Sequence, residues 1–97
     1  MSYRGRWALV TGASSGLGAQ FARALAARGA NVAATARRQS RLEALVADLR
    51  RDHAVEARAV VADLADPAAP EKVMAALADA APDILVNNAG YGLSGHF

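Results

Sequence analysis

The stretch Val10–Gly18 reads Val-Thr-Gly-Ala-Ser-Ser-Gly-Leu-Gly and joins two segments that differ in their apolar spacing. Residues 7–10, which lead into it, are apolar without interruption, as expected of a fully buried strand. From Leu17 to Leu25 the apolar residues recur at helical spacing instead. The three glycines therefore mark a turn that leads from a buried strand straight into a helix.

Each glycine of this turn has a separate physical role. Gly12 lets the chain leave the strand in a conformation that a side chain would obstruct, Gly16 lets the main chain approach a bound group, and Gly18 lets the helix pack tightly on the sheet. The first amides of the helix lack internal partners, and the positive end of the helix dipole lies behind them. This arrangement favours an anion, most naturally a phosphate, and the hydroxyls of Ser14 and Ser15 are placed to cap the helix or bond the same anion.

The spacing of the glycines narrows the kind of phosphate site. A P-loop has a lysine directly after its last glycine, whereas the only lysine of this chain is Lys72. The common dinucleotide fingerprint G-x-G-x-x-G is also absent, because Phe21 stands where its third glycine would be. The pattern present is T-G-x-x-x-G-x-G, over Thr11–Gly18. A tight junction between strand and helix, without any ligand, is the alternative that this stretch alone leaves open.

The composition of the chain excludes several classes of protein. With 97 residues, 54% of them hydrophobic, the chain is at most one globular domain. The net charge is only +2 and the arginines are spread along the chain, so a nucleic-acid-binding face is not expected. The absence of cysteine excludes disulfides and fits a reducing compartment. No apolar run approaches the roughly 18 residues of a membrane span, so we expect a cytoplasmic protein that binds neither nucleic acid nor membrane.

Apolar runs and stop signals divide the chain into alternating strands and helices. The expected strands are 6–11, 31–35, 55–62 and 84–86. The first helix follows the glycine turn and ends at residue 28. The second begins with a capping box, in which Ser40 serves the amide three residues on and Glu43 reaches back, and His53 lies in the turn after it. The third begins at Asp66-Pro67, an N-cap with proline at the first helical position, and ends before Pro82.

Short connections between continuously apolar strands are typical of a parallel sheet with helices on its faces. Right-handed crossovers and a phosphate turn after the first strand predict the strand order 3-2-1-4, with the first reversal between strands 1 and 4. Ligands of such sheets bind outside the carboxyl ends of the strands at that reversal. Four segments are expected at this edge of the sheet: Gly12–Gly18, Arg37, Asp63 and Asn88.

Three motifs at these strand ends resemble those in the N-terminal part of a short-chain dehydrogenase/reductase. Thr11–Gly18 resembles the glycine motif of that family, Asp63-Leu64 its acidic position after the third strand, and Asn87–Gly90 its N-N-A-G motif. The resemblance covers essentially the whole chain. It implies an α/β fold with a partial, Rossmann-type doubly wound parallel sheet of four strands and three helices. Residues 1–97 would be the N-terminal part of one NAD(P)-binding domain.

The resemblance also implies roles for individual residues. The glycine turn would hold the pyrophosphate of the cofactor through Gly12, Ser14, Ser15, Gly16, Leu17 and Gly18. Asp63 and the Leu64 backbone would contact the adenine. The pocket between the adenosine half and the nicotinamide ribose would be lined by Asn88, Ala89 and Gly90. Taken singly, the aspartate is also typical of a turn or a helix entry, and the asparagines of a turn at a strand end.

The choice between the two dinucleotides is argued from charge. An NAD site usually places a carboxylate near the end of the second strand, where it binds the ribose hydroxyls and would repel the 2′-phosphate of NADP. No acid occurs over residues 31–41, and Arg37 and Arg38 fill the position. A guanidinium can fork onto a phosphate and stack on adenine, so NADP is the expected cofactor. Many NADP-preferring relatives carry a basic residue at the position of Ser15, so NAD is an alternative cofactor. A solvated turn in which the two arginines bind no ligand is the alternative to a phosphate site.

The residues that carry the chemistry of the family are not found in this chain. By resemblance, a tyrosine acts as general acid or base, a lysine four positions later activates it, and a serine upstream orients the substrate oxygen. Tyr3 precedes the first strand, and Tyr91 has Gly95 four positions on. Ser94 precedes the strand on which the family places its serine. No catalytic residue and no metal ligand is therefore assigned.

We expect the chain to be the cofactor-binding half of an NADP-dependent oxidoreductase that moves hydride between nicotinamide and a carbonyl or secondary alcohol. The complete protein would be longer, would take a small carbonyl or alcohol substrate and would form homo-oligomers. A non-catalytic dinucleotide-binding regulatory or scaffold protein would have the same fold and is the alternative. An unrelated flavodoxin-like domain would require the three motifs to coincide by chance.

Overall fold

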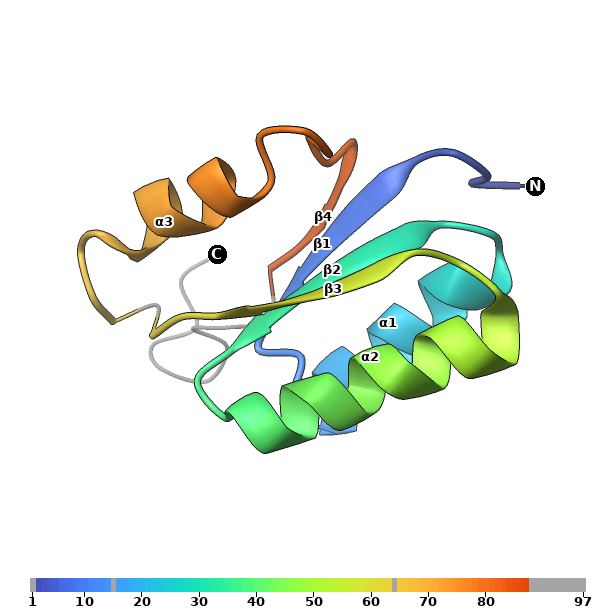
Figure 1. The fold of residues 1–97 in the computed structure, drawn as a ribbon, viewed down its shortest axis with the longest axis horizontal. Helices are drawn as coiled ribbons and strands as arrows, with labels where there is room; N and C mark the ends of the chain where they lie inside the picture. The colour runs from blue at the N-terminus through green and yellow to red at the C-terminus, as the bar shows by residue number, and fades with distance from the viewer. Residues whose placement is uncertain (1, 15, 64, 88–97) are drawn as a thin grey trace.

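The computed structural model describes residues 2–14, 16–63 and 65–87. Its elements are, in chain order, β1 (Trp7–Thr11), α1 (Gly16–Ala27), β2 (Asn31–Ala36), α2 (Gln39–His53), β3 (Ala57–Val61), α3 (Ala69–Ala76) and β4 (Ile84–Val86). Strands and helices alternate along the described chain, as Figure 1 shows. The predicted α/β character is therefore confirmed.

All of these strands belong to one parallel sheet with the order β3-β2-β1-β4, which confirms the predicted topology. β1 is an inner strand between β2 and β4; its Thr11 lies opposite Thr35 of β2 and its Val10 lies opposite Val86 of β4. Because the strands are parallel, their carboxyl ends meet at one edge of the sheet. The connections after β1, β2 and β3 all start at this edge.

The two faces of the sheet are covered by different helices. Figure 1 shows α1 and α2 on one face and α3 on the other. On the first face, Val10 and Val32 of the sheet share a buried cluster with Leu42 and Leu49 of α2. Helix α1 buries only small residues, namely Gly18, Ala22 and Ala26. Without bulky side chains between them, α1 and the sheet can approach closely, so the start of α1 is held near the end of β1.

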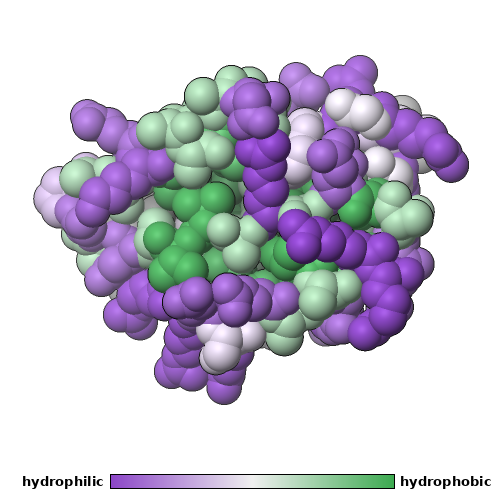
Figure 2. Space-filling model, viewed as in Figure 1, coloured by the Kyte–Doolittle hydropathy of each residue, from purple (hydrophilic) through white to green (hydrophobic). Residues whose placement is uncertain are grey.

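The second face has a smaller core. Leu9 and Ala33 of the sheet are buried there with Val73 of α3 and Leu77 just after it. The edge strand β3 runs between α2 and α3 in the view of Figure 1, and Figure 2 shows apolar surface with a polar surround in that region. Val61, the last residue of β3, is 50% exposed. The edge of the sheet at β3 is therefore partly apolar.

The capping box predicted for α2 is wrong. The helix begins at Gln39, and its N-cap is Arg38, which has an extended backbone and no side-chain cap hydrogen bond. Glu43 accepts a hydrogen bond from the Gln39 side chain at 3.0 Å instead of reaching back to Ser40. The cause is that only Arg37 and Arg38 separate the end of β2 from the helix. The amide of Leu42 can then bond the Arg38 carbonyl at 3.1 Å, which places Ser40 inside the first turn.

The predicted start of α3 is also wrong. The Asp66 carboxylate accepts a hydrogen bond from the Ala68 amide at 2.9 Å, and the Asp66 carbonyl accepts one from Ala69 at 2.9 Å. These bonds close a turn over Pro67 before the helix begins, so the N-cap is Ala68. The proline in the first helical turn is Pro70 rather than Pro67.

The second helix and the third strand meet at a different place than predicted. His53 is the last residue of α2 rather than part of the following turn. Ala54 ends the helix in a left-handed conformation with φ 55°, and its amide donates to the Arg50 carbonyl at 3.2 Å. The chain needs the next two residues to enter the sheet. For this reason β3 runs over 57–61 and is shorter than the expected 55–62.

An aromatic and charged cluster joins the end of α3 to the sheet. The guanidinium of Arg58 on β3 lies 4.9 Å from the ring centroid of Trp7 on β1, within cation–π range. The same group donates two hydrogen bonds to the carboxylate of Asp79, both at 2.7 Å. These bonds lower the pKa of Asp79 to about 2.

The Arg58–Asp79 pair predicts a pH effect on stability. Because the pKa of Asp79 is lower in the folded chain than its ordinary 3.8, its contribution is complete above about pH 4 and is lost as the pH falls toward 2. Asp79→Asn should therefore remove part of the decrease in the free energy of unfolding between pH 4 and pH 2. Urea unfolding can be followed by the fluorescence of Trp7, the only tryptophan. Asp83→Asn, at an exposed carboxyl outside this pair, is the control, and an identical flattening in both variants would contradict the assignment.

A buried hydroxyl gives a second prediction. Thr35 is fully buried in β2, and its hydroxyl has no hydrogen-bond partner among the described residues. Thr35→Val keeps the shape and removes the unsatisfied group, so the free energy of unfolding should stay unchanged or rise by up to about 1 kcal/mol. Thr11→Val is the matched control. The Thr11 hydroxyl donates to the Asn87 side chain at 3.1 Å, so its removal should destabilise the chain by about 1 kcal/mol. Urea unfolding of both variants tests this, and a clear loss of stability in Thr35→Val would count against it.

Candidate functional site

The glycine turn has the geometry that its sequence predicts. Gly12 has φ +63°, in the left-handed region that favours glycine. A Cβ atom added to Gly18 would overlap the carbonyl oxygen of Gly12 and lie 2.9 Å from its carbon. The same atom added to Gly16 would meet no heavy atom within 4 Å. Gly12 and Gly18 thus shape the turn, whereas Gly16 faces open space at the start of α1.

Hydrogen bonds tie the turn to the strands on both sides of β1. The amide of Ala13 donates to the carbonyl of Thr35 in β2 at 3.1 Å. The hydroxyl of Thr11 donates to the Asn87 side chain at 3.1 Å and lies 3.4 Å from the carbonyl of Val86. The ends of β1, β2 and β4 are therefore fixed relative to one another, and the turn lies between them.

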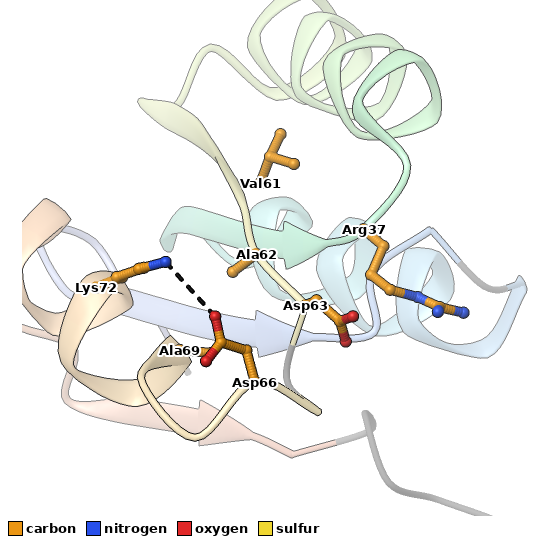
Figure 3. A pocket seen from close by; sticks show the side chains of 7 residues that line it. All are labelled: Arg37, Val61, Ala62, Asp63, Asp66, Ala69 and Lys72. Atoms are coloured by element: carbon orange, nitrogen blue, oxygen red, sulfur yellow. Dashed lines mark ion pairs between the residues drawn. The ribbon is translucent and has the colours of Figure 1, made fainter.

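A cavity opens beside the ends of β2 and β3. Its volume is about 380 Å³, within the range of small-molecule sites. Seven residues line it: Arg37, Val61, Ala62, Asp63, Asp66, Ala69 and Lys72. Figure 3 shows Asp66 and Lys72 joined on one side, with Asp63 between this pair and Arg37 in that view. The cavity thus combines two cations and two carboxylates with a short apolar wall.

Local hydrogen bonds orient both carboxylates of the cavity. One oxygen of Asp63 accepts a hydrogen bond from the Ala65 amide at 2.9 Å. Asp66 accepts the bond from Ala68 described above, and the Lys72 ammonium lies 3.5 Å from its other oxygen. The Ala68 amide first, and then the charge of Lys72, hold the pKa of Asp66 below its ordinary value. Asp66 is therefore ionised at neutral pH, and it is partly neutralised by Lys72.

The charge around the glycine turn is one-sided. The first acidic residue of the chain is Glu43, so β1, α1 and β2 contain no carboxylate side chain, and every charged side chain up to position 42 is an arginine. The exposed Arg37 and Arg38 follow directly after β2. This distribution favours an anion at the edge where α1 begins, because the positive end of the α1 dipole and the arginines act in the same direction.

The structure brings together only part of the predicted site. Arg37 and Asp63 share the cavity, whereas Arg38 is the N-cap of α2 and does not line it. The turn residues Gly12, Ser14, Gly16, Leu17 and Gly18 lie at the end of β1 and the start of α1. The remaining predicted residues lie outside the described part of the chain: Ser15, Leu64, Asn88, Ala89 and Gly90.

Sequence reasoning missed five cavity residues, of which three are apolar and two, Asp66 and Lys72, are charged. Asp66 was interpreted as a helix cap, and Lys72 served only to exclude a P-loop. Their spacing of six residues across a turn and a helix start was the available signal. This spacing predicts a contact between the two side chains only if the helix begins at Ala69, as it does in the structure.

Over residues 2–14, 16–63 and 65–87, no three acidic, histidine or cysteine side chains gather in a way that could hold a metal ion. In the same residues, no helix combines the length and the apolar character that crossing a membrane requires.

Comparison with known proteins gives the family. A model of the short chain dehydrogenase family matches residues 6–97. The very-long-chain 3-oxoacyl-CoA reductase of Meyerozyma guilliermondii is 37% identical over 89 residues, which are 90% of this chain and 26% of that protein.

Solved structures agree with this match. L-sorbose reductase of Gluconobacter frateurii, complexed with NADPH and L-sorbose, superposes with a TM-score of 0.88 and 34% identity over 94% of this chain. A short-chain dehydrogenase of Sphingobium yanoikuyae in complex with NADPH gives a TM-score of 0.81 and 45% identity over 95% of this chain. The chain covers 35% and 37% of these two proteins, so it spans little more than a third of their length. With a family match over nearly all of its residues, this chain belongs to the short-chain dehydrogenase family.

Proposed function

We propose that this chain is the cofactor-binding part of an NADP-dependent oxidoreductase. The bound nicotinamide would supply a hydride acceptor or donor for a carbonyl or secondary alcohol. The observation that carries the proposal is the meeting of the glycine turn, Arg37 and Asp63 at the carboxyl edge of one parallel sheet. The residues of this chain would bind and orient the dinucleotide, and the residues that transfer protons would come from elsewhere in the protein.

The start of α1 fits the pyrophosphate. The open space beside Gly16 leaves room for the main chain to meet a ligand directly, and no acidic side chain occurs in the first turn of the helix. Backbone amides at a helix N-terminus are suited to a phosphate because they can donate hydrogen bonds to it without desolvating a charged side chain. The hydroxyl of Ser14, half-buried in the turn, is the side-chain donor at this place.

The end of β2 fits a 2′-phosphate. Arg37 is exposed, lines the cavity and has no acidic neighbour in β2. A guanidinium can bind a phosphate with two parallel hydrogen bonds, and Arg38 adds a second positive charge at the same strand end. The oriented carboxylate of Asp63 is suited to accept a hydrogen bond from the adenine amino group. Two of the similar solved proteins contain NADPH, which supports the same choice of cofactor. NAD remains the alternative cofactor.

The other parts of the proposal rest on the family. A small carbonyl or alcohol substrate and a homo-oligomeric assembly belong to the complete protein. A cytoplasmic location is proposed from the cysteine-free sequence.

The different surroundings of two glycines give a paired test. Gly18→Ala places a methyl group against the Gly12 carbonyl and should lower the free energy of unfolding by about 1–3 kcal/mol. Gly16→Ala meets no protein atom, so stability should change by less than about 0.5 kcal/mol. Its methyl group would instead occupy the space proposed for the pyrophosphate, so NADPH affinity should fall about tenfold or more. Urea unfolding and calorimetric titration separate the two effects, and unchanged NADPH affinity in Gly16→Ala would exclude the pyrophosphate from this position.

Charge reversal at Arg37 tests the choice of cofactor. Arg37→Asp should weaken NADPH binding by roughly 10- to 100-fold, the effect of losing a hydrogen-bonded charge pair, and should leave NADH binding within about threefold. Arg6→Asp is the matched control, since it makes the same charge change at the amino end of β1. Dissociation constants from calorimetry provide the measurement. An equal loss of affinity for both dinucleotides would refute the assignment of Arg37 to the 2′-phosphate.

A further inference from the structure

Of the two carboxylates in the cavity beside Arg37, Asp63 is proposed to bind the adenine, whereas Asp66 works against the proposed ligand. Asp66 lines the same space, and its 44% exposed side chain is ionised at neutral pH. A full negative charge on this wall would repel a 2′-phosphate held by Arg37. NADH lacks that phosphate and would not be repelled in the same way. A cation beside Asp66 would remove this repulsion and let the cavity favour NADP.

Lys72 is placed to supply that charge. Its ammonium lies 3.5 Å from the Asp66 carboxylate, and its side chain lines the cavity opposite Arg37 in the view of Figure 3. The backbone holds both partners in position. Asp66 is fixed by the Ala68 amide, and the amide of Lys72 donates to the Ala68 carbonyl at 3.2 Å, so both partners are bonded to the same residue.

We propose that Lys72 is a positioning residue for cofactor choice, which favours NADP over NAD by neutralising Asp66 at the rim of the cavity that Arg37 lines. This inference rests on the proposed function, because it requires a 2′-phosphate at Arg37. Lys72 acts through Asp66 and need not touch the phosphate. Its effect is electrostatic, so it must depend on charge and on ionic strength rather than on the exact side chain.

Four variants of the complete protein test this inference. Lys72→Gln removes the charge and keeps most of the stem, Lys72→Arg keeps the charge, and Asp66→Asn removes the repulsive carboxylate. The fourth variant combines Lys72→Gln with Asp66→Asn. Dissociation constants for NADPH and NADH are measured by calorimetry at low salt and near 1 M salt, and circular dichroism confirms that each variant is folded.

We expect the affinity for NADPH to change and the affinity for NADH to stay nearly the same. Lys72→Gln should weaken NADPH binding about three- to tenfold at low salt, as expected for one partly screened charge at the rim, and should leave NADH binding within about twofold. Near 1 M salt, where the screening length is about 3 Å, this difference should disappear. Lys72→Arg and the double variant should both bind NADPH within about twofold of the original chain.

Other results would overturn the inference and identify which part failed. If the original chain prefers NADPH and Arg37→Asp removes that preference, but Lys72→Gln has no effect, the inference fails and the proposed function stands. If Lys72→Gln weakens the binding of NADPH and NADH equally, Lys72 has a structural role at the start of α3. If the double variant binds NADPH as weakly as Lys72→Gln does, the lysine does not act through Asp66. No preference for NADPH in the original chain would overturn the inference together with the proposed cofactor.

Discussion

The close approach of Gly18 to the carbonyl of Gly12 is the constraint on which the rest of the site depends. No side chain fits between these residues, so α1 begins directly against the end of β1. Because Gly12 turns in the left-handed region, the chain reverses within a few residues and the first amides of α1 remain at the edge of the sheet. The hydrogen bonds from Ala13 to β2 and from Thr11 to the end of β4 then fix this turn relative to its neighbours.

The distribution of acidic and basic residues along the chain favours an anion at this turn. Acidic residues occur only from Glu43 onward. The acids of α2 pair on its surface, where Asp48 contacts Arg23 of α1 and Arg51 of α2. The arginines between the helices are thus partly neutralised away from the site. The carboxylates that do reach the cavity, Asp63 and Asp66, are each oriented by a local amide.

The fold could be predicted because its signals are local. The apolar runs and the short connections predict a parallel sheet, the phosphate turn after the first strand predicts the order 3-2-1-4, and the structure has that order. The helix starts were less predictable, because Ser40 and Asp66 are suited both to capping and to other local bonds. Their actual bonds depend on where β2 ends and on where Val73 docks on the sheet. The pairing of Asp66 with Lys72 follows from that docking and could not be predicted from spacing alone.

The central place of β1 has a consequence for how the chain folds. This strand is synthesised first, yet one of its two neighbours is β4, and the bonded residues Thr11 and Val86 are 75 positions apart. Contacts between distant parts of a chain form slowly, because a long loop must close before they are gained. β1, α1 and β2 can associate while the ribosome is still adding residues, whereas the other flank of β1 stays bare until β4 emerges. A nascent chain therefore exposes an apolar strand edge until β4 has emerged, and chaperone binding is most useful in this interval.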